Sequence, residues 1–241
     1  MLSFGNYLPE ISEKYTADLR KHHWPKEKVV ALIVYLLDNY YFRIGNLRYA
    51  KQNRSYGLTT LRKKHIQEGS GNLTISYKAK SGKMRKVTIE NNTIAKKIRQ
   101  ISELQGYEIF RYQDDDGQSK KIDSSDINEY LYGITGGDFT AKDFRTWGAS
   151  KLAFEFYEEA CEALTNNPRL KFETKLIKMI AKAIGNTIST CRKYYVHPEV
   201  LAFLTDQHPK PLHEIFRANI KKHESLDEFE NYLLYTLSKK I

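Results

Sequence analysis

Hydrophobic residues recur at helical spacing along most of the chain. In the first such segment Leu8, Ile11, Tyr15 and Leu19 share one face of a helix. The pattern predicts helices over 8–22, from Pro25 through the apolar run Val29–Leu37, and over 93–104, 125–132, 140–164, 173–184 and 226–238. The chain therefore reads as mainly helical.

One segment instead has the period of a β-strand. From Leu73 to Ala79 apolar and polar residues alternate, Ser81-Gly82 turns the chain, and the alternation then resumes. We predict a β-hairpin over about 73–90 that packs its apolar residues inward and turns its lysines outward. The predicted fold class is α+β, mainly helical with a small antiparallel β-hairpin or sheet.

The positive charge of the chain is concentrated in one stretch. The whole chain carries a net charge of +10, and Arg43–Lys86 contains 12 Lys and Arg residues against one acid, Glu68. The rest is close to neutral, with 27 basic and 28 acidic residues. A segment this polarised favours contact with a polyanion, and nucleic acid fits better than a membrane because the segment has no amphipathic apolar face.

Other features limit the class of protein. The longest apolar stretch, Val29–Leu37, is too short to span a membrane, and the first residues lack the pattern of a secretory signal. Cys161 and Cys191 have no metal-ligand spacing, which indicates a reducing, intracellular setting without structural zinc.

Five short patterns carry the candidate chemistry, and they occur in a fixed order. They are Arg43-Ile-Gly45, Ser55-Tyr-Gly-Leu-Thr-Thr-Leu61, Lys80-Ser-Gly beside the hairpin turn, Lys142-Asp-Phe-Arg-Thr-Trp147, and Asn186 followed nine residues later by Tyr195. Together they resemble the motifs of type IB DNA topoisomerases, particularly the small poxviral and bacterial enzymes. The resemblance spans about residues 2–240 and implies the tyrosine recombinase/type IB topoisomerase-like fold.

The resemblance implies a role for each candidate catalytic residue. Tyr195 is expected to attack a phosphodiester and form a 3′-phosphotyrosine. Arg43 and Arg145 are expected to hold the scissile phosphate, because a guanidinium stays charged and presents a planar pair of donors to two oxygens. Lys80 is expected to protonate the leaving 5′-oxygen. Asn186, where many relatives have histidine, is expected to donate one hydrogen bond to a phosphate oxygen.

The same resemblance places a second group of residues against the DNA. Those expected to bind DNA are Tyr49, Asn53, Thr59, Thr60, Lys63, Lys64 and Lys142. The implied partner is double-stranded DNA, with no membrane, no cofactor, no metal and no ATP. A monomer in the cytoplasm, associated with the nucleoid in a bacterium, is expected.

The residues leave some alternatives open. A tyrosine recombinase or integrase shares the fold and the chemistry, although it usually has a His-x-x-Arg box where this chain has Lys142-Asp-Phe-Arg145. A non-catalytic DNA-binding module on the same scaffold is the other alternative. Tyr194 competes with Tyr195 as nucleophile, and Lys78 and Lys83 compete with Lys80.

The expected organisation is one catalytic domain over 1–241. Its nucleophile-bearing segment is expected at about 173–241. The N-terminal β-rich clamp domain that small enzymes of this family usually carry is expected to be absent from this chain.

Overall fold

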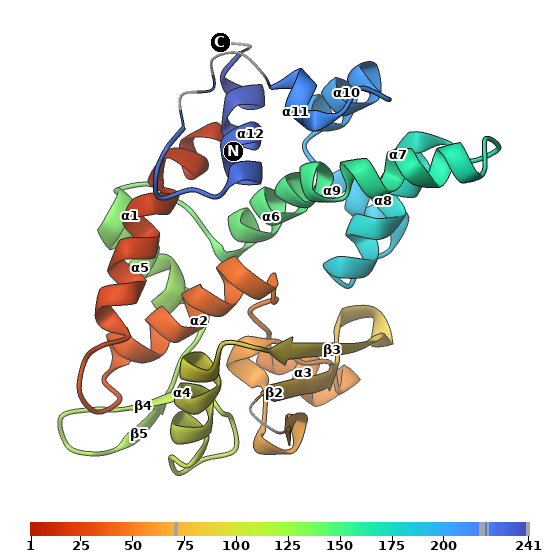
Figure 1. The fold of residues 1–241 in the computed structure, drawn as a ribbon. Helices are drawn as coiled ribbons and strands as arrows, with labels where there is room; N and C mark the ends of the chain where they lie inside the picture. Colours follow the sequence, from red (N-terminus) through yellow and green to blue (C-terminus); the bar gives the residue numbers. More distant parts are fainter. Residues whose placement is uncertain (70–71, 217–219, 221, 240–241) are drawn as a thin grey trace. The chain divides into compact units, whose positions relative to one another are not determined.

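Most of the fold is helical, and many helices begin at a residue whose side chain accepts backbone N–H bonds. The computed structural model describes residues 1–69, 72–216, 220 and 222–239 (Figure 1). Asn91, Asp123 and Asp227 each accept such bonds from the first turn of a helix. Pro25 precedes another helix, with its φ of −67° already suited to that position.

The chain divides into two compact units. One unit consists of Met1–Pro9 and Asp143–Ile241, and the other of Glu10–Lys142. Helix α1 (Leu2–Asp18) contributes residues to both. The single catalytic domain expected over 1–241 stays a prediction.

The unit Glu10–Lys142 combines helices with the sheet. Its further elements are α2 (Lys26–Tyr40), α3 (Leu47–Asn53), the 3-10 turns Leu58–Thr60, Lys63–His65 and Lys80–Gly82, β1 (Ile66–Glu68), β2 (Leu73–Lys78), β3 (Met84–Ile89), α4 (Asn92–Ser102), β4 (Arg111–Gln113), β5 (Ser119–Lys121) and α5 (Ser124–Thr135). In Figure 1, α2 and α4 lie beside the hairpin of β2 and β3. Helix α2 supplies much of the core through Val29–Leu37, where every residue but Tyr35 is buried.

The hairpin lies at the predicted position. Strands β1, β2 and β3 form an antiparallel sheet in that order, with Ile75 opposite Val87. Leu73, Ile75 and Tyr77 are buried, as the alternation predicted. Arg85 lies opposite Tyr77 and is also buried, so the inner face includes one charged residue.

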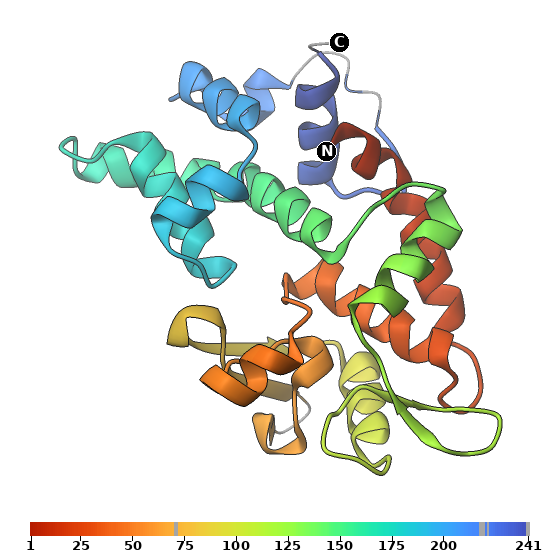
Figure 2. The same ribbon diagram turned by 180° about the vertical axis from the view of Figure 1, so that it is seen from behind.

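The other unit is helical in the residues that the structure describes. Its elements are α6 (Ala141–Glu155, from Asp143 onward), α7 (Tyr157–Asn166), α8 (Phe172–Ala183), α9 (Ile188–Tyr194), α10 (Pro198–Gln207), α11 (Leu212–Ile215) and α12 (Glu228–Ser238). Figure 2 shows the same helices from behind, with α7 and α8 side by side. The N-terminal residues complete its core, because the Phe4 ring packs edge-on against Phe144 with centroids 5.0 Å apart.

Three helix predictions need correction. The first helix is Leu2–Asp18 rather than 8–22, because Phe4 and Gly5 pack against the core around Trp147 and order the residues before Leu8. The long helix over 140–164 is interrupted at Phe156, whose backbone leaves the helical region. Helices α9 to α11 lie where none was predicted. Helices α9 and α11 have only seven and four residues, which is too short for a clear period. Helix α10 has apolar residues at helical spacing and Pro198 at its start, so its signal was present in the sequence and was missed.

The described helices include none that is long and apolar enough to cross a membrane. Among these same residues, no group of three or more His, Cys, Asp or Glu side chains is placed to hold a metal ion.

Candidate functional site

The Arg43-Ile-Gly45 loop is held by backbone hydrogen bonds to the Ser55–Leu61 segment. The N–H of Leu58 donates to the Arg43 carbonyl at 2.8 Å, and the N–H of Thr59 donates to the Ile44 carbonyl at 2.7 Å. Two motifs that are separate in the sequence thus form one substructure. The second motif fixes the backbone from which the Arg43 side chain extends.

Two glycines let these backbones approach each other. Gly45 has a φ of +110°, which a side chain rarely allows. Gly57 is in an ordinary extended conformation, and its need for glycine is one of space. A Cβ on Gly57 would lie 2.5 Å from the Gly45 nitrogen and 2.6 Å from the Arg43 oxygen.

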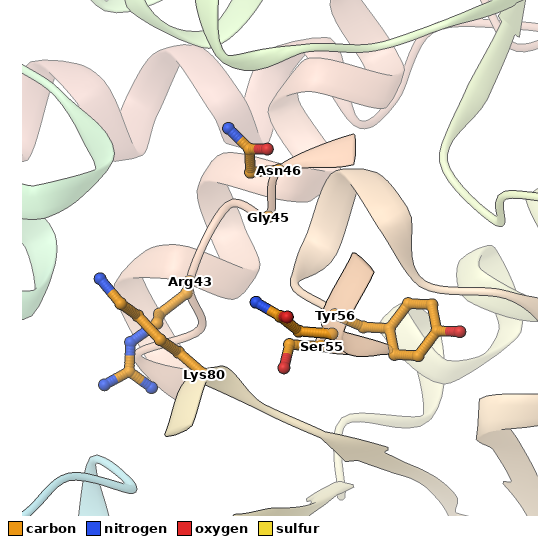
Figure 3. Close-up of a pocket in the computed structure, with 7 residues that line it drawn as sticks. Arg43, Gly45, Asn46, Ser55, Tyr56 and Lys80 are labelled. Carbon is orange, nitrogen blue, oxygen red and sulfur yellow. The ribbon is translucent and has the colours of Figure 1, made fainter. Parts of the chain in front are cut away.

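Arg43 and Lys80 line the same pocket. This pocket has a volume of about 380 Å³ and is also lined by Gly45, Asn46, Asn53, Ser55 and Tyr56. Figure 3 shows Arg43 and Lys80 extending to one side of the pocket while Tyr56 extends to the other. The N–H of Tyr56 donates to the Lys78 carbonyl at 2.8 Å, which ties this loop to the strand that precedes Lys80. Two of the five predicted catalytic residues are therefore neighbours in the folded unit.

Arg85 holds the residues that lead into the Arg43 loop. Its side chain donates to the carbonyl of Tyr40, at the end of α2, at 2.7 Å, and its guanidinium lies 5.3 Å from the centre of the Phe42 ring. A cation at this place interacts favourably with both the helix C-terminus and the aromatic face. Burial lowers the pKa of Arg85, and the nearby charge of Arg43 lowers it further. Sequence reasoning missed this residue.

His65 belongs to a cluster around Tyr56. The two rings are 4.4 Å apart, and the charged groups of Arg62 and Lys64 lie 5.6 and 6.0 Å from the centre of the Tyr56 ring. The Nδ1 of His65 accepts the N–H of Arg62 at 3.0 Å. Burial lowers the pKa of His65 to about 4, helped by the charges of Lys64 and Arg62. The imidazole is therefore neutral at pH 7, as its role of acceptor requires.

The residues predicted to bind DNA differ in exposure. Asn53, Lys63, Lys64 and Lys142 are exposed. Thr59 and Thr60 are buried, and both hydroxyls bond inside the loop, to the carbonyls of Ile44 and Gly57. The side chain of Tyr49 lies outside the part of the chain that is described.

The other three predicted catalytic residues lie in the helical unit. Arg145 is only 3% exposed, and its Nη2 donates to the carbonyl of Ile184 at 3.1 Å. That carbonyl belongs to the end of α8, where no intrahelical donor remains for it. Gly185 then adopts a φ of +66° and reverses the chain into Asn186. Arg145 and Asn186 are thereby connected through the terminus of one helix.

Tyr195 lies against Arg145. The guanidinium carbon is 4.9 Å from the centre of the Tyr195 ring. Tyr195 follows directly after α9, and its N–H donates to the Cys191 carbonyl at 3.0 Å. Tyr194 is 54% exposed. Of the two adjacent tyrosines, Tyr195 is the one for which a contact with a predicted catalytic residue is seen.

Ser150 connects helix α6 to the backbone of Tyr195 and His197. It is fully buried on α6, the helix of Arg145, and its hydroxyl accepts the N–H of His197 at 3.0 Å. The same hydroxyl lies within bonding distance of the carbonyls of Thr146, at 2.9 Å, and Tyr195, at 3.4 Å. Ser150 was missed because a small polar residue in a buried helix gives no pattern; only its place five residues after Arg145 marks it.

Two neighbours of Tyr195 have structural roles. The Nδ1 of His197 accepts the N–H of Glu199 and caps α10, and burial lowers the pKa of the imidazole. Burial raises the pKa of the Cys191 thiol to about 11 against the opposing effect of Arg145, so it is neutral and packed.

Comparison with known protein families gives one match over most of the chain. Residues 1–222 match the family described as eukaryotic DNA topoisomerase I, catalytic core.

Individual relatives agree with this match. The chain is 32% identical over 201 residues to DNA topoisomerase 1B of Acanthamoeba polyphaga mimivirus, covering 82% of this chain and 57% of the relative. It is 21% identical over 206 residues to DNA topoisomerase 1B of vaccinia virus, covering 84% and 62%. It is 24% identical over 195 residues to DNA topoisomerase 1 of rabbit fibroma virus, covering 79% and 56%. The chain thus spans about 60% of the length of these relatives.

Replacing Gly57 tests the close approach of the two loops. Gly57→Ala is expected to lower the free energy of unfolding by ~1–3 kcal/mol, because the added methyl group meets backbone atoms that have no room to move. Gly133→Ala is the matched control. A Cβ there meets nothing within 4 Å, so alanine is expected to stabilise α5 by ~0.5–1 kcal/mol. Urea denaturation measures both, and an unchanged stability of Gly57→Ala would refute the packing argument.

The neutral state of His65 predicts a pH dependence of stability. Since its pKa is about 4 in the folded protein and about 6.5 when unfolded, the unfolded chain binds more protons between these values. The stabilisation is fully present above pH ~6.5 and decreases as the pH falls toward 4. His65→Asn keeps an acceptor for Arg62 without titrating in this range, and is expected to flatten the decrease. The exposed His213→Asn controls for loss of a histidine; equal slopes for the two variants would contradict the assignment.

Proposed function

Because the chain belongs to the type IB DNA topoisomerase family, we propose that it relaxes supercoiled DNA by cutting one strand through Tyr195 and rejoining it. The observation that carries this proposal is the contact between Arg145 and Tyr195, together with the anchoring of the Tyr195 backbone by Ser150. Tyr195 lies beside the buried, permanently charged guanidinium of Arg145. Its backbone is hydrogen-bonded to Ser150 on α6 and to Cys191 on α9. This arrangement suits attack on a phosphate.

The reaction needs a nucleophile, charge stabilisation and a proton for the leaving group. The phenol of Tyr195 loses its proton to water, and its oxygen bonds to phosphorus as the bond to the deoxyribose 5′-oxygen breaks, which leaves a 3′-phosphotyrosyl link and a 5′-hydroxyl. The link retains the phosphodiester bond energy, so the 5′-hydroxyl reverses the step without ATP. Between the two steps the cut strand rotates.

Arginine and lysine residues supply the charge and the proton. Arg43 and Arg145 stabilise the negative charge that grows on the phosphate oxygens during attack. Lys80, in the pocket with Arg43, gives its proton to the departing 5′-oxygen. Asn186 adds a hydrogen bond from a neutral amide to a phosphate oxygen.

A small group of exposed side chains in the Glu10–Lys142 unit then holds the duplex. The exposed residues Asn53, Lys63, Lys64 and Lys142 suit direct contact with DNA phosphates. For the buried Thr59 and Thr60 we propose an indirect role, because their hydroxyls hold the loop on which Arg43 stands. Double-stranded DNA is the proposed substrate, and a monomer suffices for this chemistry.

The nucleophile is tested by removing one oxygen atom. Tyr195→Phe is expected to bind duplex DNA as the parent does, yet to form no protein–DNA adduct on a nicked or suicide substrate. Denaturing gels detect the adduct, and peptide mass spectrometry identifies the modified residue. Tyr194→Phe, at the exposed neighbouring position, controls for loss of a phenol and is expected to form the adduct normally. An adduct formed by Tyr195→Phe would overturn the assignment.

Plasmid relaxation by the same proteins tests the wider function. The parent chain is expected to remove supercoils with EDTA present and ATP absent, whereas Tyr195→Phe is not. Adduct formation that depends strictly on paired inverted sites would instead indicate a recombinase, and DNA binding with no adduct at all would indicate a non-catalytic module.

The anchoring by Ser150 predicts a defect in rate rather than in affinity. Ser150→Ala leaves the His197 N–H without its acceptor and loosens the backbone of Tyr195, so single-turnover cleavage at saturating DNA is expected to slow by about 10- to 100-fold. The dissociation constant for duplex DNA is expected to stay within about 2-fold. Thr205→Ala is the matched control, because its hydroxyl also bonds to the carbonyl four residues earlier but has no link to Tyr195. A Ser150→Ala rate equal to that of the control would refute the role.

A further inference from the structure

Helix α8 carries a row of lysines for which the proposed function has no role. Lys171 immediately precedes the helix, and Lys175, Lys178 and Lys182 follow at intervals of four, three and four residues. At 100° per residue these four positions fall within about 60° of one another around the helix axis. They extend over ~17 Å along it. We call these four residues the α8 lysine row.

The opposite face of α8 is buried in its unit. Phe172, Leu176, Ile177 and Ile180 are each 6% exposed or less, and the helix packs against α7 and α9. Three of the four lysines are exposed and Lys175 is partly exposed. The row therefore faces outward from the unit by necessity, because the apolar face fixes the rotation of the helix.

The fold itself does little to stabilise the charges of the α8 lysine row. Among the described residues no acidic side chain lies within ion-pair distance of any of the four lysines. The acid of this helix, Glu173, pairs with Arg192 on α9 instead. Like charges three or four residues apart on a helix repel each other and destabilise it. A row of like charges therefore lowers the stability of α8 unless an anion binds beside it.

We propose that the α8 lysine row is a second DNA-backbone contact, located in the unit that carries Tyr195. The proposal rests on the proposed DNA substrate and adds a site to it. One strand of duplex DNA presents a phosphate about every 3.4 Å of its axis, so a row of ~17 Å is long enough to reach several phosphates before the strand winds away from it. Helix α8 ends at Ala183, and the carbonyl of the next residue, Ile184, accepts from Arg145, so the row leads along the chain to the predicted catalytic residues.

A duplex fits this surface better than an anionic membrane. Membrane-bound helices insert an apolar face beside their basic residues, but the apolar face of α8 is occupied by its own unit. The row is flanked by Thr174 on one side and Met179 on the other. An ordered line of phosphates needs charge at regular spacing, and that is what the row offers.

The salt dependence of binding tests this contact. In a variant with Lys171→Gln, Lys175→Gln, Lys178→Gln and Lys182→Gln, each lost phosphate contact lowers the slope of log K against log salt by ~0.9. We expect the slope for duplex DNA to fall by at least about 2, equally for unrelated sequences. The control replaces four exposed lysines elsewhere, Lys96, Lys210, Lys222 and Lys239, by glutamine and lowers the net charge by the same amount.

The possible outcomes separate this inference from the proposed function. Thermal melting of the row variant is expected at or above that of the parent, since repulsion is relieved, which excludes unfolding as the cause of weaker binding. Equal slopes for the row variant and the control would overturn the inference while adduct formation by Tyr195 persists. Loss of binding to anionic vesicles, with DNA binding unchanged, would assign the row to a membrane and overturn it as well. Failure of the parent chain to form any adduct would refute the proposed function instead.

Discussion

A guanidinium that is buried away from water needs acceptors or aromatic faces around it, and each unit of this chain is arranged around one such group. In the helical unit it is Arg145, which is bound to the end of α8 and lies against the Tyr195 ring. In the other unit it is Arg85, which is bound to the end of α2 and lies against Phe42. Both charges occupy the C-terminal end of a helix, where the last carbonyls lack donors and the helix dipole favours a cation.

This constraint links packing to the proposed chemistry. Arg85 holds the backbone between Tyr40 and Phe42, and Arg43 is the next residue along the chain. The Ser55–Leu61 segment fixes the same loop from its other side through Gly57 and Leu58. The Arg43 side chain therefore extends from a backbone that is hydrogen-bonded on both sides. The positive charges of Arg85 and Arg43 lie close together and repel each other. A phosphate between Arg43 and Lys80 would relieve this repulsion.

The sequence predicted those features whose signal is local. Alternation predicted the position of the hairpin and its buried face, and the motifs indicated Arg43, Lys80, Arg145 and Tyr195 as candidates. It did not predict α9, because a helix of seven residues is marginal alone and depends on burying Cys191 against α8. Ser150 and Arg85 were not predicted either, since their partners are more than 40 residues away and no spacing connects them.

Charge counting missed the α8 lysine row for a different reason. The preceding helix, α7, contains Glu158, Glu159 and Glu162, so a window that covers both helices has almost no net charge. In the folded chain these acidic residues lie on α7 and the lysines of the row lie on α8. The lysines form a basic face only when α8 brings them to one side of the helix. A sum along the chain therefore finds a basic surface only when one continuous segment forms it, as Arg43–Lys86 does.

The groups around Tyr195 share one further property, which is a charge that does not change near neutral pH. Arg145 keeps its proton at any working pH, Asn186 is a neutral amide, and the pKa of Cys191, at about 11, keeps the thiol neutral. Burial of His197 lowers its pKa, which favours the neutral ring that caps α10. These four side chains thus contribute a constant charge near neutral pH.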